Sequence, residues 1–504
     1  MDYIIVQAGG KGTRLGYLTK NRPKCLVPVG NLPMLFHLFR KYPDKNFVII
    51  ADYKKEVLWE YLDCFARVKY LVVDAEGEGT CSGIAQAVRL IPEGQPFMLI
   101  WSDLILPDPF ELPEGYGENT AEKDYIGISK SFPCRWSYKD GFFLEEKSAE
   151  HGVAGFFLFS EKSKLKNIPE SGELVRWMQL EKMYFEEIAL AGTKEFGILE
   201  EYNNLEKEKC RPFNRMTVTE NKVRKEGIDE QGKALAERES RWYKEVRKKK
   251  IASIPEIYQT DPLEMERIQG KNIYECDLTY PEKKAVLVKL VNALKALHGT
   301  EFRMPDEFSR EKAYFRKTME RIAPVRDLIP FADRRIIRIN GRNCRNVFYH
   351  KRELEKKLGQ VSCQGFCLIH GDCTFSNLML RENGEPVMID PRGYFGYQEL
   401  YGDPLYDWAK LYYSIVGNYD RFNLKDFRLD IGQEEVKLQI ASNHWEDMEE
   451  DFFALTGTDR ESVKLLHAVI WLSLTTYAWQ DYDSICGAFY NGLYYLEDTH
   501  AFLF

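Results

Sequence analysis

The stretch Gly9-Gly10-Lys11-Gly12-Thr13-Arg14 follows the apolar run Tyr3–Val6, and this strand followed by a glycine-rich turn decides how the first half of the chain is interpreted. Glycines leave room for backbone N–H groups to approach the oxygens of a triphosphate, and Lys11 and Arg14 add positive charge for a developing pyrophosphate. A glycine-rich turn alone also serves strand-to-helix packing. Together with the motifs that follow, the turn predicts a site for a nucleoside triphosphate.

Apolar strands and helix-like stretches alternate after this turn. The runs Phe47–Ile50, Tyr70–Val73 and Phe97–Trp101 repeat the pattern of the first strand. Helix-like segments lie between them, at Leu35–Lys41 and Gly83–Leu90. Such alternation predicts an α/β domain with a parallel sheet that is covered on both faces.

Two charged residues extend the predicted nucleotide site. Lys24 follows Pro23 and supplies a second cation after the turn, and Asp103 comes just after the strand that ends at Trp101. Open parallel sheets bind ligands at the carboxyl ends of their strands, where a carboxylate holds Mg²⁺ against a triphosphate. Asp103 is therefore predicted to bind Mg²⁺. The competing interpretation is a helix cap or a turn residue.

These motifs resemble those of the sugar-1-phosphate nucleotidyltransferases, of the glucose-1-phosphate thymidylyltransferase or MobA-like kind, over residues 1 to about 205. The resemblance implies a Rossmann-like, GT-A-like sheet domain in which a sugar 1-phosphate attacks the α-phosphorus of a nucleoside triphosphate and releases pyrophosphate. It assigns catalysis to Arg14 and Lys24. The residues that it assigns to nucleotide binding are Gly9, Gly10, Lys11, Gly12, Thr13, Gly83 and Gln86.

The same resemblance implies that Lys147 meets the sugar phosphate and that Glu173 contacts the sugar. The sequence departs from the family at Ser148, which replaces a proline, and at Glu195, which stands in place of a second metal-binding aspartate. Glu195 either binds Mg²⁺ through its longer side chain or is an ordinary surface glutamate. A cytidylyltransferase acting on phosphocholine has the same opening motif, but Lys147 and Glu173 favour a sugar.

The pattern of predicted strands and helices changes near residue 208. Asn214–Val218 and Lys222–Lys225 predict a strand pair, a charged helix follows over Gly232–Lys250, and the chain after Ala285 is mostly helical. We therefore expect two domains, residues 1–208 and 209–504, with a boundary uncertain by roughly ten residues. The second domain is expected to have a small lobe at 209–300 and a helical lobe at 301–504.

The second half contains a phosphoryl-transfer motif, His370-Gly371-Asp372 with Asn377 five residues further on, and Asp390 at the end of a later apolar run. Phosphoryl transfer needs a carboxylate that accepts the proton of the attacking hydroxyl and oxygen ligands for Mg²⁺. Asp372 fits the catalytic base, and Asn377 and Asp390 fit the metal ligands. Aspartate and asparagine are also common turn residues. Further carboxylates in Gly402–Lys410 are expected to brace the catalytic loop.

This pattern resembles the aminoglycoside phosphotransferase and choline kinase superfamily, from about residue 212 to the end, and implies a protein-kinase-like α+β domain with ATP between its lobes. The resemblance implies that Phe213–Thr219 covers the phosphates, that Lys225 binds them and that Glu239 is its helix partner. The alternative for Glu239 is a solvated helix face. Arg392 is expected to bind substrate. A set of aromatic residues is either a cage for a quaternary ammonium or helical core, and core is favoured: Trp408, Tyr412, Tyr413, Trp445, Trp471, Tyr477 and Trp479.

Composition narrows the functional class. The chain has 504 residues and a formal net charge of −8, which favours small-molecule chemistry over binding to nucleic acid or anionic lipid. The 11 cysteines lack framework spacing, as in a reducing cytoplasm, and no apolar stretch is long enough to span a bilayer. We therefore expect a cytoplasmic enzyme without membrane or nucleic-acid partners. Assembly into a homo-oligomer is left open.

The hypothesis that unites the halves is a bifunctional enzyme. A kinase phosphorylates a small hydroxylated molecule, a sugar above all, with ATP, and a nucleotidyltransferase joins the product to a second nucleoside triphosphate, CTP, UTP or dTTP. Mg²⁺ is the expected cofactor of both steps. The alternative is a choline kinase and phosphocholine cytidylyltransferase that makes CDP-choline for surface polysaccharide decoration. A third reading makes one half a non-catalytic nucleotide sensor or scaffold.

Overall fold

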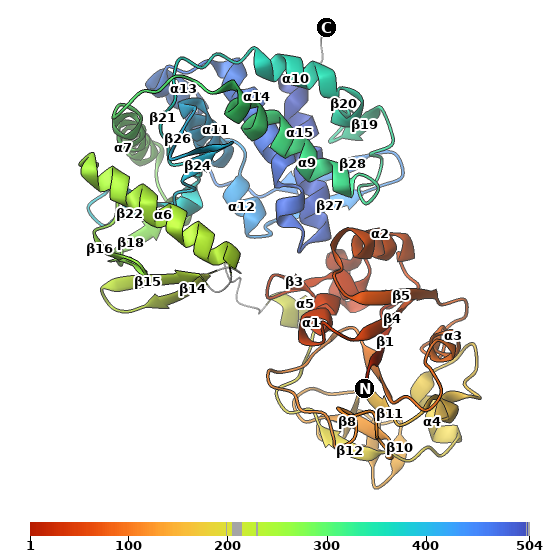
Figure 1. The fold of residues 1–504 in the computed structure, drawn as a ribbon. Coiled ribbons are helices and arrows are strands. Elements are labelled where there is room, and N and C mark those ends of the chain that lie inside the picture. The colour runs from red at the N-terminus through yellow and green to blue at the C-terminus, as the bar shows by residue number, and fades with distance from the viewer. Residues whose placement is uncertain (198, 204–213, 228–229, 500, 502–504) are drawn as a thin grey trace. The chain divides into compact units, whose positions relative to one another are not determined.

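The computed structural model describes residues 1–197, 199–203, 214–227, 230–499 and 501. The chain divides into two compact units, Met1–Glu208 with Trp479–Tyr482, and Lys209–Ala478 with Asp483–Phe504 (Figure 1). The predicted boundary at residue 208 lies outside the described residues, as does Phe213 of the predicted phosphate-covering strand.

A mixed sheet of nine described strands forms the centre of the first unit. Its strands β5, β4, β1 and β6 are parallel neighbours, with β1 between β4 and β6. Strand β11 runs antiparallel to β6, β8 and β9, and β10 and β12 extend the sheet by pairing with β9 and β8. The strands of this sheet are β1 (Tyr3–Gln7), β4 (Asn46–Ala51), β5 (Lys69–Asp74), β6 (Phe97–Trp101), β8 (Tyr125–Ser129), β9 (Ser137–Lys139), β10 (Phe142–Leu144), β11 (Gly152–Phe159) and β12 (Glu186–Ala189).

The predicted α/β class is confirmed, and the four strands predicted to be parallel are parallel neighbours, whereas the strands beyond β6, for which the sequence made no prediction, add antiparallel pairs. Gly152–Phe159 is an unbroken buried strand, and its antiparallel pairing extends the sheet away from the nucleotide motif. The parallel half explains why the predicted strands read as continuous apolar runs, because parallel strands are buried on both faces.

Side chains on alternate sides of β4 pack against different helices. Phe47 contacts Phe39 of α1, with ring centroids 4.8 Å apart, whereas Val48 belongs to the core cluster that contains Ile84 of α3. Because successive side chains of a strand point to opposite faces, helices cover both faces here. The helices of this unit are α1 (Met34–Lys41), α2 (Lys55–Phe65), α3 (Ile84–Arg89), α4 (Leu174–Leu180) and α5 (Leu199–Asn203), and its short strand pairs are β2 (Pro28–Val29) with β3 (Leu32–Pro33) and β7 (Leu104–Ile105) with β13 (Lys194–Glu195).

The second unit begins with a small sheet and the long helix α6 (Glu230–Lys248). The sheet has the order β14 (Asn214–Val218), β15 (Lys222–Gly227), β17 (Leu263–Glu266) and β16 (Ile257–Thr260). The strand pair predicted from the sequence is present as β14 and β15. Its tight turn is closed by the N–H of Thr219, which donates to the carbonyl of Lys222 at 2.9 Å.

Helices and short strand pairs make up the rest of this unit. The helices are α7 (Tyr280–His298), α8 (Glu307–Glu311), α9 (Lys317–Ile322), α10 (Lys351–Gly359), α11 (Pro404–Ile415), α12 (Tyr419–Asn423), α13 (Glu449–Thr456), α14 (Arg460–Leu474) and α15 (Tyr482–Asp498). The strands are β18 (Gly270–Asn272), β19 (Ile336–Ile339), β20 (Arg342–Arg345), β21 (Cys367–Leu368), β22 (Leu378–Arg381), β23 (Pro386–Met388), β24 (Tyr394–Phe395), β25 (Gln398–Glu399), β26 (Tyr401–Gly402), β27 (Phe427–Ile431) and β28 (Val436–Ile440).

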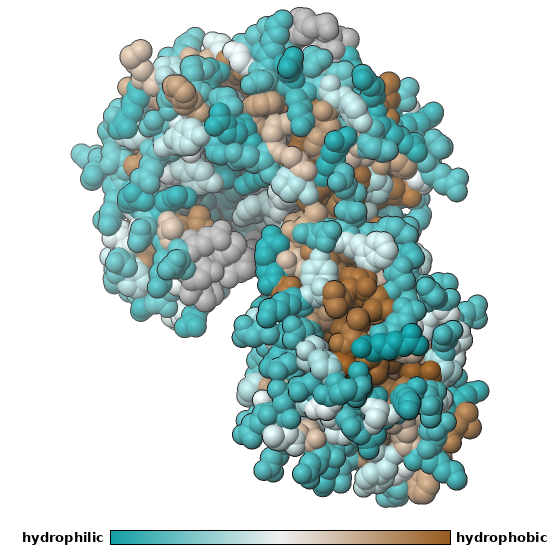
Figure 2. Space-filling view, turned by 45° about the vertical axis from the view of Figure 1, so that its right-hand side comes forward, coloured by the Kyte–Doolittle hydropathy of each residue, from teal (hydrophilic) through white to brown (hydrophobic). Residues whose placement is uncertain are grey.

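The aromatic residues considered for a cation cage lie mainly in the core of the helical lobe. Trp408, Tyr412, Tyr413, Trp445 and Trp471 are all buried, and only Tyr477 is largely exposed, at 63%. Polar side chains cover most of the surface that Figure 2 shows, and apolar ones gather in one patch on the first unit. Within the described part of the chain, no helix is long and apolar enough to cross a membrane.

Candidate active sites

The glycine-rich turn of the first unit directly follows β1. Gly12 has φ of 62°, in the left-handed region that favours glycine. A Cβ atom on Gly9 would lie 2.6 Å from the Cβ of Asp52, so a side chain does not fit there. The space beside Gly10 is open, and its carbonyl accepts the N–H of Lys24 at 3.3 Å. The turn therefore presents exposed backbone beside a cation.

Lys24 and Asp103 meet at the base of this turn. The ammonium of Lys24 contacts Oδ2 of Asp103 in an ion pair whose side chains are only 11% and 13% exposed. The other oxygen of Asp103, Oδ1, is buried and has no hydrogen-bond partner among the described residues. A buried carboxylate oxygen without a donor is a favourable ligand for a cation. Asp103 thus has the geometry expected of a metal ligand.

Glu195 lies next to Asp103 across a short strand pair. Strand β13 pairs with β7, so that Glu195 is opposite Leu104, and the N–H of Phe196 donates to the carbonyl of Asp103 at 3.2 Å. Oε1 of Glu195 is 3.6 Å from Nη2 of Arg14. Burial raises the pKa of the neighbouring Cys134 thiol to about 12, and the charges of Glu195 and Asp103 add to this shift. Both carboxylates therefore converge with Arg14 and Lys24.

The two residues predicted to bind the sugar and its phosphate, Glu173 and Lys147, differ in their contacts. Glu173 accepts from Nε1 of Trp136 at 2.8 Å and pairs with Arg135 at 3.3 Å. Lys147 is exposed. Thr80, which the sequence analysis missed, links the segment of Glu173 to the nucleotide motif. Its carbonyl accepts from Gln7 at the end of β1, and its hydroxyl accepts the N–H of Leu174 at 2.8 Å.

Gly83 and Gln86 begin helix α3, as the motif predicts. Gly83 has φ of 78°, and a Cβ there would lie 2.5 Å from Cγ2 of Ile50 in β4. Gln86 is half-buried one turn into the helix. A residue larger than glycine would push α3 away from the sheet.

In the second unit, Lys225 of β15 lies between two carboxylates. Its Nζ is 2.8 Å from Oε1 of Glu239 on α6 and contacts Oδ1 of Asp390. Both Lys225 and Glu239 are buried, which answers the alternative of a solvated helix face for Glu239. Asp390 adopts φ of 55°, which turns its side chain out of the preceding strand β23. The structure therefore brings together the three residues predicted from distant parts of the sequence.

Asp372 stands between Asn377 and a lysine that the sequence analysis did not single out. Nδ2 of Asn377 donates to Oδ2 of Asp372 at 3.1 Å, and Nζ of Lys410 is 3.0 Å from Oδ1. Burial opposes ionisation of Asp372, but Lys410 and Arg392 more than offset it, so its pKa lies below the ordinary value. Asp372 is therefore an anion at neutral pH.

Asp407 braces the catalytic loop, as expected of a carboxylate in this segment. Its two oxygens accept the N–H groups of His370 at 2.8 Å and Gly371 at 2.7 Å. His298 adds a third contact, with Nε2 3.0 Å from Asp407. The ring of His370 is fixed in turn, with Nε2 against the carbonyl of Ile389 at 2.9 Å. The loop that carries Asp372 is thus held by buried polar groups.

The residues present fit divalent cations in both units. In each one, a lysine ammonium contacts the carboxylate that the sequence assigns to the metal, Lys24 at Asp103 and Lys225 at Asp390, so positive charge is already accommodated there. The sequence predicts two ligands in each unit, Asp103 with Glu195 and Asn377 with Asp390. Over the described ranges, no three His, Cys, Asp or Glu side chains gather as one metal site. Nucleotide phosphates would complete the coordination, as is usual for Mg²⁺.

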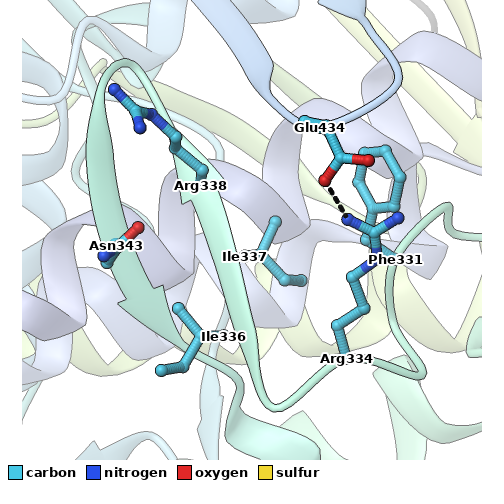
Figure 3. Close-up of a pocket in the computed structure, with 7 residues that line it drawn as sticks. All are labelled: Phe331, Arg334, Ile336, Ile337, Arg338, Asn343 and Glu434. Carbon is cyan, nitrogen blue, oxygen red and sulfur yellow. Dashed lines mark hydrogen bonds and ion pairs between the residues drawn. The ribbon is translucent and has the colours of Figure 1, made fainter.

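A separate pocket lies on the helical lobe beside β19 (Figure 3). It is lined by Phe331, Arg334, Ile336, Ile337, Arg338, Asn343 and Glu434. None of the predicted site residues lines it. Arg334 pairs with Glu434 at 3.3 Å and Arg338 pairs with Glu435 at 3.6 Å, so each arginine of the pocket has a carboxylate partner.

Two protein-family models match the chain. The family described as "Nucleotidyl transferase" matches residues 3–122, and the "Phosphotransferase enzyme family" matches residues 228–438. The first covers the glycine-rich turn and Asp103. The second covers Glu239, Asp372, Asn377 and Asp390, and it begins three residues after Lys225.

Curated relatives match a limited part of the chain. The bifunctional protein GlmU of Methanocaldococcus jannaschii is 36% identical over 115 residues, which cover 22% of this chain and 27% of the relative. Mannose-1-phosphate guanyltransferase of Yarrowia lipolytica is 32% identical over 142 residues, covering 26% and 39%. The chain thus spans well under half the length of these relatives. Among solved structures, CTP:phosphocholine cytidylyltransferase from Streptococcus pneumoniae shares 18% identity with a TM-score of 0.33, covering 41% of this chain and 98% of that one.

Proposed function

Because the chain carries an N-terminal nucleotidyl transferase domain and a C-terminal domain of the phosphotransferase enzyme family, we propose that it performs two consecutive steps on one small molecule. The C-terminal domain phosphorylates a hydroxyl group with ATP. The N-terminal domain then couples the phosphorylated product to a second nucleoside triphosphate and releases pyrophosphate. The observation that carries this proposal is that each domain brings its predicted charged residues into contact, Lys24 with Asp103 in the first and Lys225 with Asp390 in the second.

In the first step, Asp372 orients the acceptor hydroxyl and accepts its proton as the oxygen bonds to the γ-phosphorus. Lys410 holds one oxygen of Asp372 and Asn377 the other, so the carboxylate is fixed before the substrate arrives. Lys225, steadied by Glu239, neutralises the phosphates of ATP. Mg²⁺ held by Asn377 and Asp390 would supply further neutralisation of the phosphate charge.

In the second step, the phosphate oxygen of the intermediate attacks the α-phosphorus of the nucleoside triphosphate. The open backbone of the turn beside Gly10 holds the triphosphate, and Arg14 and Lys24 neutralise the departing pyrophosphate. Mg²⁺ held by Asp103 and Glu195 would stabilise the same charge. Glu173 and Lys147 bind the sugar and its phosphate, so that a phosphate oxygen reaches the α-phosphorus.

A sugar is the favoured substrate class. The names of the curated relatives include a mannose-1-phosphate guanyltransferase, and the predicted sugar-binding Glu173 is held in place by Trp136 and Arg135. The alternative with choline draws no support from the aromatic residues, because five of the seven considered for a cage are buried in the core.

The test uses purified full-length protein with ATP, a second nucleoside triphosphate and a panel of sugars, sugar acids, polyols and choline. Pyrophosphate release that requires both ATP and a free acceptor supports two linked steps. The variants Asp372→Asn and Asp103→Asn serve as matched controls for the first and the second step. Pyrophosphate release without ATP from an unphosphorylated acceptor, or no ADP formation with any acceptor, would refute the proposal.

A further inference from the structure

A group of cations surrounds Asp372 on the side away from Asn377. Lys410 pairs with the carboxylate, and Lys317 on α9 reaches Tyr406, with Nζ 3.3 Å from its hydroxyl. Lys317 and Lys410 flank the same ring, at 5.1 Å and 6.0 Å from its centroid. Two cations from different helices thus meet at Tyr406, next to the predicted catalytic base.

Two arginines extend this group. Nη2 of Arg392 donates to the hydroxyl of Tyr394 at 2.5 Å. Arg321, one helical turn after Lys317, donates to the carbonyl of Ser473 at 2.7 Å and lies 5.4 Å from the ring of Tyr477. Like charges four residues apart destabilise a helix. We define the acceptor cations as Lys317, Arg321 and Arg392.

The acceptor cations are not neutralised by the protein. Among the described residues, no carboxylate lies within 4.0 Å of any of the three. Burial lowers the pKa of Lys317 well below its ordinary value, and Arg392, Arg321 and Lys410 lower it further. Lys317, Arg321 and Arg392 are half-buried. Arg321 and Arg392 thus carry positive charge beside a lysine whose protonation they oppose, and a bound anion would relieve this repulsion.

We propose that the acceptor of the kinase domain carries a negatively charged group, a carboxylate or a phosphate, beside the hydroxyl that is phosphorylated, and that the acceptor cations bind this group. The inference rests on the proposed function and narrows its substrate class to anionic molecules such as sugar acids or sugar phosphates. It disfavours choline, whose quaternary ammonium would be repelled. Arginine is suited to this task because its fork matches carboxylate and phosphate oxygens.

The acceptor cations and the residues predicted to bind ATP lie on different sides of the Asp372 carboxylate. The nucleotide side is marked by Asn377 at Oδ2 and by the Lys225–Asp390 contact, whereas Lys410 and its neighbours stand at Oδ1. In the transfer, the acceptor oxygen bonds to the γ-phosphorus, the bond from that phosphorus to the bridging oxygen of ADP breaks, and the hydroxyl proton passes to Asp372. The anionic group of the acceptor stays bound on the Oδ1 side throughout.

Matched pairs of acceptors test the inference with the full-length protein. ADP release is measured with glucose against glucuronate and glucose 6-phosphate, with galactose against galacturonate, with glycerol against glycerate, and with choline. The anionic member of at least one pair is expected to exceed its neutral partner at least tenfold in kcat/KM. Glucuronate and glucose 6-phosphate distinguish a carboxylate site from a phosphate site. Preference for a neutral acceptor or for choline overturns the inference but leaves the two-step function standing.

The variants Lys317→Gln and Arg321→Gln locate the site. Each is expected to raise KM for the anionic acceptor about tenfold and to leave KM for ATP within about twofold, as for loss of one charge-assisted bond. Arg316→Gln is the control, because Arg316 is exposed and pairs with Glu311 at 3.0 Å. Removal of an unneutralised cation should keep or raise Tm, whereas loss of a purely structural residue should lower it. A rise in KM for ATP instead assigns the cations to the nucleotide and refutes the inference.

If no acceptor of the panel is phosphorylated, equilibrium binding of anionic ligands tests the inference instead. Glucuronate and glucose 6-phosphate are titrated into the wild type and both variants, with a non-hydrolysable ATP analogue present. Binding that weakens about tenfold in the variants, and with rising salt, supports the site. Equal binding by all three proteins, or none by the wild type, refutes it. Absence of turnover with every acceptor then counts against the two-step function alone.

Discussion

The two active sites of this chain hold their charged residues in different ways. In the kinase domain, Asp407 ties down the backbone on either side of His370, and both oxygens of Asp372 are engaged by side chains. In the nucleotidyltransferase domain, the Lys24–Asp103 pair is buried, but Arg14 and Lys147 are exposed. We therefore expect the kinase site to be organised before substrate binds, and we expect Arg14 and Lys147 of the nucleotidyltransferase site to become ordered when its substrates bind.

Asp372→Asn should produce the largest effect. The amide keeps the shape of the side chain but removes the base, so phosphoryl transfer is expected to fall by roughly 10²- to 10⁴-fold. Pyrophosphate release from a supplied phosphorylated acceptor should stay unchanged, because it depends on the other site. Separate assays of ADP and pyrophosphate check this. Equal loss in both assays would mean that the two sites do not act independently.

Asp103→Asn should have the complementary effect. The amide leaves Lys24 without its carboxylate and removes a predicted metal ligand, so pyrophosphate release should fall by about 10²-fold, the usual scale for loss of one electrostatic stabiliser. ADP formation should not change. Raising the Mg²⁺ concentration should restore part of the activity if Asp103 binds the metal. Failure of Mg²⁺ to improve the rate at any concentration would contradict the metal role.

Asp407→Asn probes the organisation of the kinase site without touching substrate. An asparagine offers one acceptor where two backbone N–H groups need one each, and a buried unsatisfied group costs about 1–3 kcal/mol. We expect a lower Tm for the kinase domain, a kcat lower by about tenfold and a KM for ATP close to that of the wild type. An unchanged kcat would show that the loop does not depend on this brace.

The sequence predicted those site residues that belong to short local motifs. Gly12, Asp103 and Asp390 each follow a strand, and strand ends can be recognised from apolar runs and turn residues. The residues Lys225, Glu239 and Asp390 were also proposed separately from resemblance, and the structure joins them in one contact network.

The sequence did not predict site residues on helix surfaces, and it did not predict the direction in which distant strands pair. Lys317 and Arg321 look like ordinary charges on a helix surface, and only folding brings α9 beside Lys410 and Arg392. Strand β11 is likewise apolar throughout, and an apolar run does not tell whether its neighbour is parallel or antiparallel. Pairing direction depends on the connection between the strands, which local pattern does not record.

The smallest expected effect concerns stability and comes from Asp420, which accepts the N–H of Ser376 at 2.8 Å in the same loop as Asn377. Burial raises its pKa from 3.8 to about 6, against the opposing hydrogen bonds of Ser414 and Ser376. The native state therefore holds a proton that the unfolded state has released between about pH 4 and pH 6, so this residue makes stability fall as pH rises through that window. A shift of about two pKa units corresponds to about 3 kcal/mol in the free energy of unfolding.

The variant Asp420→Asn has no carboxyl group to titrate at this position. Its free energy of unfolding, relative to that of the wild type, should therefore increase by up to that amount between pH 4 and pH 7. Denaturant unfolding of the kinase domain at several pH values measures this difference, and a difference that stays constant with pH would show that Asp420 ionises normally in the folded protein.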